Sequence, residues 1–287
     1  MRELGDATPS SEVLNELFDA IFDLLRPEGP TGIPTAVDHA YDMIWRQLIK
    51  GEREAGERLT DTELATQLGI SRTPVRQALH RLAQEELVRL DARRGFSVRV
   101  FTAQDVNEIY EVRGALEVLA LKLAAPQLTV DDLQDQLERL YEVRDALRTK
   151  PDLSAHVLHL QADLAFHNLI IRSAGNGRLL RMLASLRSQQ ALFQYWDISF
   201  PQANKTAGEE HERILLALIA GNKDHAAAHL AQHITNAKNR VLTDLFGVDG
   251  PTRSGDIEHS SDGRNSPGDT RAPQSNREET ESVEIKT

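Results

Sequence analysis

The hydrophobic positions near the start of the chain follow the 3.6-residue period of helices. Apolar side chains recur every three to four residues over 35–50, which predicts an amphipathic helix that ends at Gly51. A second, shorter helix is expected over 61–68, where Thr60 and Glu63 have the spacing of a capping box.

The pattern then predicts a third helix and two strands. We expect Thr73 to cap this helix and Pro74 to take its first position, where a missing amide hydrogen costs nothing. Apolar residues alternate over 88–90 and 96–101, as in strands, and 91–95 joins them as a hairpin. Two short helices followed by a hairpin are typical of a winged helix-turn-helix that binds DNA.

The rest of the chain is predicted to be helical until its acidic end, so the expected fold is mainly α. The winged helix-turn-helix is followed by an antiparallel all-helical bundle. The expected helices cover residues 103–125, 129–149, 153–174, 177–197, 207–220 and 223–246.

Four segments follow from this pattern. Residues 1–34 form an N-terminal extension, and its apolar spacing over 10–26 predicts an amphipathic helix that packs on the body or serves as an arm for a dimer or partner. Residues 35–101 form the DNA-binding domain and 102–246 the helical effector- and metal-binding domain. Residues 247–287 have almost no apolar side chains and are expected to be a disordered acidic tail.

Composition limits the chemistry and the location. The absence of cysteine excludes disulfides, thiolate zinc sites and a cysteine nucleophile. No apolar run approaches the roughly 18 residues of a membrane span, and the N-terminus lacks a signal-peptide pattern, so we expect a cytoplasmic protein without a membrane partner.

The net charge of −11 is unevenly distributed. Residues 35–101 contain 11 basic and 10 acidic side chains, and every other segment is net acidic. DNA affinity depends on such local patches. Because this patch is modest, one copy should bind DNA weakly, and a homodimer is expected.

The start of the third helix carries the side chains predicted to read DNA. Arg72, Thr73, Arg76 and Gln77 occupy positions that face base edges in a recognition helix. Arginine can bind guanine through two hydrogen bonds, and Arg76 is the strongest candidate for this contact. Arg72 and Thr73 could instead hold phosphates.

The hairpin is predicted to be a DNA-contacting wing. Gly95 would let its tip approach the minor groove closely, with Arg93 and Arg94 contacting phosphates or the groove. Arg58 is a further candidate for a backbone contact.

A group of histidines in the bundle suggests a metal site. Asp163 and His167 lie four residues apart and share a helix face, and His211 and His233 lie on later helices. Three imidazoles and one carboxylate suit Zn²⁺, Ni²⁺ or Mn²⁺, with zinc favoured. Spacing alone leaves other histidines open as ligands: His156, His159, His225 and His229.

Several motifs resemble the GntR family of bacterial transcription regulators. They are Leu48-Ile49-Lys50-Gly51, Gly56-Glu57-Arg58-Leu59, Glu63-Leu64-Ala65, Ser71-Arg72-Thr73-Pro74-Val75-Arg76-Gln77-Ala78-Leu79 and Gly95. Two positions depart from the family pattern: Ala55 replaces a usual proline, and Glu86 replaces a usual glycine at the turn into the wing. The helical half resembles the FCD ligand-binding domain of the FadR branch, in its shorter VanR-like form, so the resemblance covers 35–246.

The resemblance implies roles for the bundle residues. The order of Asp163, His167, His211 and His233 is similar to the metal-binding FCD pattern. Arg113 and Glu117 are either a surface ion pair or, as in similar domains, part of the effector pocket.

The implied function is a ligand-responsive transcription regulator, a repressor that senses a small carboxylate at a metal-containing pocket. As a homodimer it would bind a palindromic double-stranded operator, and no catalysis is required. One alternative is a metal-dependent hydrolase or oxygenase with a DNA-binding domain. Another is a regulator with a structural metal and an effector site elsewhere.

Overall fold

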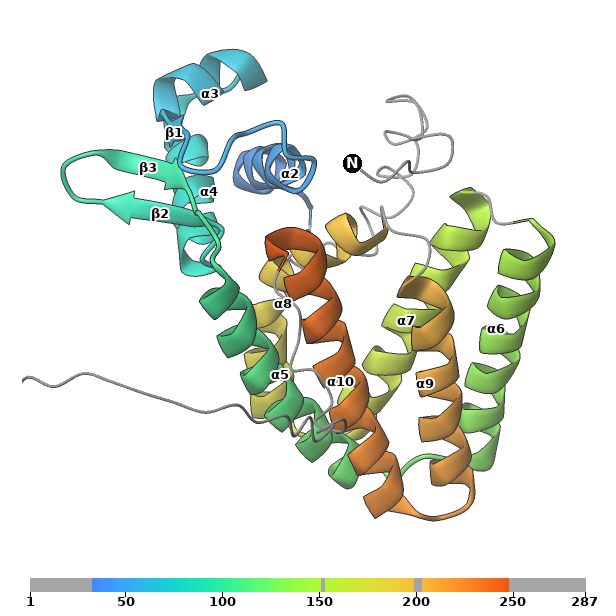
Figure 1. The fold of residues 1–287 in the computed structure, drawn as a ribbon. Coiled ribbons are helices and arrows are strands. Elements are labelled where there is room, and N and C mark those ends of the chain that lie inside the picture. The colour runs from blue at the N-terminus through green and yellow to red at the C-terminus, as the bar shows by residue number, and fades with distance from the viewer. Residues whose placement is uncertain (1–32, 151–152, 199–202, 248–287) are drawn as a thin grey trace, which may run out of the picture. The chain divides into compact units, whose positions relative to one another are not determined.

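The computed structural model describes residues 33–150, 153–198 and 203–247, so the expected helix over 10–26 and the expected tail lie outside the described residues. The first part of the chain contains three helices and three short strands (Figure 1). In chain order they are α2 (Ala36–Ile49), β1 (Arg58–Leu59), α3 (Asp61–Leu68), α4 (Arg72–Gln84), β2 (Val88–Asp91) and β3 (Gly95–Val98).

The strands form one antiparallel sheet in the order β1-β3-β2. The predicted hairpin is confirmed, with Leu90 opposite Phe96 and Asp91 opposite Gly95. The second strand of the hairpin ends at Val98, three residues earlier than expected. On its other side, β3 pairs with β1, which sequence reasoning missed because two residues are too few to show a period.

The start of the recognition helix differs from the prediction. Helix α4 begins at Arg72 with Ser71 as its N-cap, so Thr73 lies inside the first turn and Pro74 is the third helical residue. Proline is tolerated there because the first four amides of a helix have no intrahelical acceptor. The capping box of α3 is only half formed. The Thr60 hydroxyl accepts a hydrogen bond from the Glu63 amide, but the Glu63 carboxylate lies 3.8 Å from Arg53 Nη1.

Glu86 joins α4 to the wing in a left-handed backbone conformation, with φ of 59°. It is the only non-glycine residue with positive φ among the described residues. Glycine adopts this conformation without steric cost, which explains the family preference noted above. The Glu86 carboxylate forms an ion pair with Arg99, which also bonds to Asp105 at the start of the bundle.

The second part of the chain is a bundle of long helices (Figure 1). They are α5 (Ala103–Ala124), α6 (Val130–Thr149), α7 (Leu153–Ser173), α8 (Gly177–Ile198), α9 (Ala203–Ile219) and α10 (Lys223–Phe246). Helix α10 packs against α5 and α9, and α6 packs against α7 and α9. The predicted helices are confirmed, although α9 begins at Ala203 rather than at residue 207. Within the described residues, no helix combines the length and apolar character needed to cross a bilayer.

Both parts share one apolar cluster. Tyr41, Trp45 and Leu82 of the DNA-binding part are buried together with Ala191 and Leu192 of α8. Burial of apolar surface is non-directional and favours any arrangement that keeps this cluster closed. A displacement of α8 would therefore be transmitted to α2 and α4.

Candidate metal centre and DNA-binding surface

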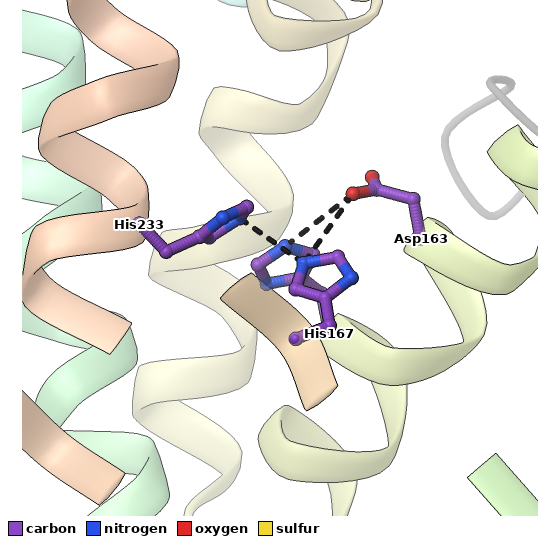
Figure 2. A group of neighbouring side chains, drawn as sticks. Asp163, His167 and His233 are labelled. Atoms are coloured by element: carbon purple, nitrogen blue, oxygen red, sulfur yellow. Dashed lines mark hydrogen bonds and ion pairs between the residues drawn. The ribbon is translucent and has the colours of Figure 1, made fainter. Parts of the chain in front are cut away.

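The four predicted metal ligands meet inside the bundle. Asp163 and His167 lie one turn apart on α7, and His211 and His233 come from α9 and α10. One ligand atom from each lies within 4.8 Å of all the others. Figure 2 shows Asp163, His167 and His233 pointing toward a common centre.

The distances among the ligand atoms suit a metal ion. Zinc bonds of about 2.0–2.2 Å in tetrahedral geometry place neighbouring ligand atoms about 3.3–3.6 Å apart. The His211 Nε2 atom lies 3.2 Å from His233 Nε2 and 3.6 Å from Asp163 Oδ1. The Asp163 Oδ1 atom lies 3.8 Å from His167 Nε2. Little movement would be needed to bring all four atoms into one coordination shell.

The protonation of the histidines also suits a metal. Burial lowers the pKa of His211 well below its usual value, and it also lowers the pKa of His233. The neutral imidazole, which is the form that binds metals, is therefore favoured at neutral pH. The His211 ring stacks on Phe166 with a centroid distance of 4.1 Å, which fixes its plane.

Buried carboxylates orient two of the three imidazoles. The Nδ1 atom of His167 lies 2.6 Å from Glu117 Oε2, and the Nδ1 atom of His233 lies 2.8 Å from Glu210 Oε2. The other Glu210 oxygen accepts a hydrogen bond of 2.5 Å from Asn236. Such partners turn the opposite ring nitrogen toward the metal and raise its basicity.

Arg113 and Glu117 form a buried pair, so their interpretation as a surface ion pair is wrong. Their exposed fractions are 5% and 2%, and Arg113 Nε donates to Glu117 Oε1 at 2.6 Å. Burial alone would raise the pKa of Glu117, but the charges of Arg113 and His167 outweigh it and hold this pKa well below its ordinary value. Arg113 Nη2 also lies 3.4 Å from His167 Nε2, which places a guanidinium at the edge of the metal cluster.

The other histidines lie outside this cluster. His225 and His229 are exposed on α10, and His159 is buried on α7 but contributes no ligand atom to the group. The side chain of His156 lies outside the described residues. Sequence reasoning missed Glu210 and Asn236, although Glu210 directly precedes His211 and Asn236 follows His233 by three residues.

A cavity of about 210 Å³ lies against the metal cluster. His167, Arg113 and Glu117 line it together with residues of α7, α8 and the last turn of α4. Cavities that bind drug-sized ligands measure about 300–1,000 Å³, so this cavity suits a small molecule.

The predicted base-reading residues share the exposed face of α4. Arg72, Thr73, Arg76 and Gln77 are all exposed, whereas Val75 and the other apolar residues of this helix face the core. Arg72 Nη2 lies 3.0 Å from Asp61 Oδ1, and this hydrogen bond lowers the pKa of Asp61. In this structure Asp61 therefore occupies a group that a DNA phosphate could bind.

The wing presents its own cations. The Asp91 carboxylate accepts hydrogen bonds from the amides of Arg93 and Arg94, at 2.8 and 2.9 Å, which holds the turn. Gly95 completes the turn with φ of 78°. Both arginine side chains are exposed, as is Arg58 on β1.

Comparison with known proteins identifies both parts. Residues 36–98 match the family of bacterial regulatory proteins called gntR, and residues 108–236 match the FCD domain. The Nta operon transcriptional regulator of Aminobacter aminovorans is 32% identical over 67% of this chain and 88% of its own. The chain belongs to the GntR family.

Other GntR regulators are similar over the same region. The gluconate operon transcriptional repressor of Bacillus licheniformis is 29% identical over 67% of this chain and 76% of its own. The solved structure of E. coli McbR/YncC, at 26% identity, covers 71% of this chain and 95% of its own, with a TM-score of 0.55. These relatives are transcription regulators, which supports a regulator with an FCD domain over a metal-dependent enzyme.

Proposed function

We propose that this GntR regulator is a repressor that senses a small carboxylate at a divalent metal held by Asp163, His167, His211 and His233. The observation that carries the proposal is the juxtaposition of this four-residue cluster with a cavity that His167 and Arg113 line. A bound metal would supply positive charge for a carboxylate oxygen, and the guanidinium of Arg113 would supply hydrogen-bond donors. A relative named as a gluconate operon repressor supports both repression and a carboxylate signal.

On DNA, we propose that Arg76 and Gln77 contact bases while Arg72 and Thr73 hold phosphates. Arg93 and Arg94 would contact the groove beside the wing, with Arg58 on the backbone. This division follows from their positions, because side chains at the start of a recognition helix meet base edges.

We also propose that two copies bind a palindromic operator. Helix α5 exposes Val112, Leu119 and Leu123, which share one helix face and have exposed fractions of 48%, 45% and 39%. An apolar stripe of this kind is suited to cover the same stripe of a second copy. Sedimentation of the full chain should show a dimer, and Leu119→Lys should yield a monomer. A wild-type chain that sediments as a monomer would exclude this part of the proposal. The cytoplasmic location stays a prediction.

Metal binding is tested by thermal unfolding of the stripped protein with Zn²⁺, Ni²⁺ or Mn²⁺. At 100 times the dissociation constant, a bound metal stabilises the fold by about 2.7 kcal/mol. This shift should persist in His229→Ala, whose side chain is exposed outside the cluster, and disappear in His233→Ala. Equal shifts in both variants would contradict the assigned ligands.

The effector is tested on DNA selected by the zinc-loaded protein from a random pool. Fluorescence anisotropy should show that gluconate or another small carboxylate lowers DNA affinity, and that stripping the metal removes this effect. If metal stabilises the fold while no acid in a panel of small carboxylates changes DNA binding, the metal is structural and the proposed sensing is wrong.

A further inference from the structure

The cavity beside the metal cluster also reaches the DNA-binding part. Besides His167 and Arg113, its lining includes Arg81 and Glu85, which lie at the end of the recognition helix α4. Arg172 of α7 and Arg187 of α8 line the same cavity. One small cavity therefore touches both the metal cluster and the helix that reads DNA.

The described lining carries an excess of positive charge. It contains four arginines and two carboxylates. Glu117 is bound to Arg113, and Glu85 Oε1 lies 3.3 Å from Arg81 Nε, so each carboxylate already balances one guanidinium. Arg172 and Arg187 make up the excess.

Arg187 is held in place without a carboxylate in its described hydrogen bond. Its Nη2 atom donates to Asn168 Oδ1 at 2.5 Å, which uses one of the five N–H donors of the guanidinium. Asn168 directly follows the metal ligand His167 on α7. A cationic, partly buried guanidinium with a neutral partner is suited to bind an anion.

The residues after Arg187 bind the end of the recognition helix. Ser188 Oγ donates to Glu85 Oε2 at 2.5 Å, and Gln189 Nε2 donates to the Glu85 carbonyl oxygen at 3.2 Å. Tyr41 OH donates to the same Oε2 atom at 2.5 Å. Ser188 and Gln189 are 1% and 4% exposed, so these bonds are shielded from water. We call these contacts of Glu85 the Glu85 latch.

We propose that the effector carries two anionic groups, one at the metal and Arg113 and the other at Arg187 and Arg172. This inference rests on the proposed function, and it defines the ligand as a small acid with two anionic ends. Because Arg187 precedes Ser188 on α8, binding of the second anion acts directly on the Glu85 latch. A ligand with one anionic group fills the metal end and leaves the latch unchanged.

Calorimetry with the zinc-loaded full chain tests the second anionic group. The probes are the linear dicarboxylates from malonate to adipate, each paired with the monocarboxylate of the same carbon number. The preferred dicarboxylate should bind at least about tenfold more tightly than its partner, the difference expected for a charge-assisted hydrogen-bonded pair. Arg187→Gln should abolish this preference without changing monocarboxylate affinity, and Arg187→Lys should retain part of it.

Arg181→Gln is the matched control, because Arg181 lies on the same helix, is exposed and does not line the cavity. It should keep the full preference. If the wild type binds both members of every pair equally, or if Arg187→Gln keeps the preference, the second anionic group is disproved while the metal site stands. If no acid binds the zinc-loaded protein, the proposed function itself fails, and this inference fails with it.

Ser188→Ala tests the Glu85 latch separately from binding. This variant should bind the preferred dicarboxylate within about twofold of the wild type, because Ser188 does not line the cavity. The fall in DNA affinity that the dicarboxylate causes should be reduced severalfold. An unchanged fall in DNA affinity would show that the latch has no part in the response.

Discussion

Replacing Glu117 by glutamine tests how the metal cluster is built. The change removes the negative charge between Arg113 and His167 while keeping the side chain almost the same size. Arg113, 5% exposed, would remain as a buried cation next to a neutral amide. Breaking a buried ion pair by removing one partner costs about 3–5 kcal/mol. Because the amide oxygen can still accept a hydrogen bond from Arg113, we expect a loss near the lower end, about 3 kcal/mol.

The same substitution should also weaken metal binding. Glu117 Oε2 lies 2.6 Å from His167 Nδ1 and sets the orientation and basicity of that imidazole. Loss of such a partner typically lowers metal affinity by about 10- to 100-fold. The two effects are separable, because the stability loss is measured without metal and the affinity loss by zinc titration.

Two measurements decide the outcome. Urea unfolding of the stripped protein, followed by circular dichroism, gives the free energy of unfolding. Zinc titration against a chelator of known affinity gives the dissociation constant. Glu111→Gln is the control, because Glu111 lies on the same helix with a side chain that is 69% exposed, and it should change neither value measurably. An unchanged zinc affinity in Glu117→Gln would refute the positioning role, and an unchanged urea midpoint would refute the energetic argument.

Three further predictions concern the DNA-binding part. Arg76→Ala should abolish sequence-specific binding to selected DNA in a mobility-shift assay, a loss of about 1–3 kcal/mol if the side chain reads a guanine, and unchanged affinity would refute the assignment. Asp61→Asn should release Arg72 for a phosphate and tighten DNA binding by up to about fivefold in anisotropy, whereas weaker binding would show that Asp61 positions Arg72 productively. Glu86→Gly should unfold at a higher urea concentration than Glu86→Ala, because only glycine relieves the left-handed backbone, by about 1 kcal/mol. Equal midpoints for the two variants would show that no strain is stored there.

The sequence predicts the helices of this chain well because their ends carry strong local signals. The Thr102 and Thr129 caps form full capping boxes with Asp105 and Asp132, so two boundaries of the bundle depend only on neighbouring residues. The start of α4 was misplaced for the opposite reason. Ser71 and Thr73 are both good cap residues, and proline is tolerated at several positions of the first turn, so local chemistry does not choose between them.

The choice between His229 and His233 shows where spacing alone becomes insufficient. Four residues on an α-helix turn by about 400°, so the two side chains differ in direction by only about 40°. The buried face of α10 includes Ala226, Leu230 and Ile234, and His229 lies beyond the edge of this arc on the side away from Ile234. Only packing against α5 and α9 reveals that edge. The bonds of His233 to Glu210 and of Ser188 to Glu85 depend on the same tertiary packing.

The contacts also explain how a signal at the metal could reach DNA without a large rearrangement. His167 and Asn168 are adjacent on α7, and Asn168 is hydrogen-bonded to Arg187 on α8. Ser188, the next residue, is hydrogen-bonded to Glu85 at the end of α4. The path therefore consists of two hydrogen bonds and two steps along rigid helices, and each bond has a discrete made or broken state. Since α4 also shares its apolar core with α8, breaking the bond at Glu85 would shift the balance between two packed arrangements rather than unfold either part. A regulator built in this way needs few DNA contacts per copy, because the position of α4 controls all of them together.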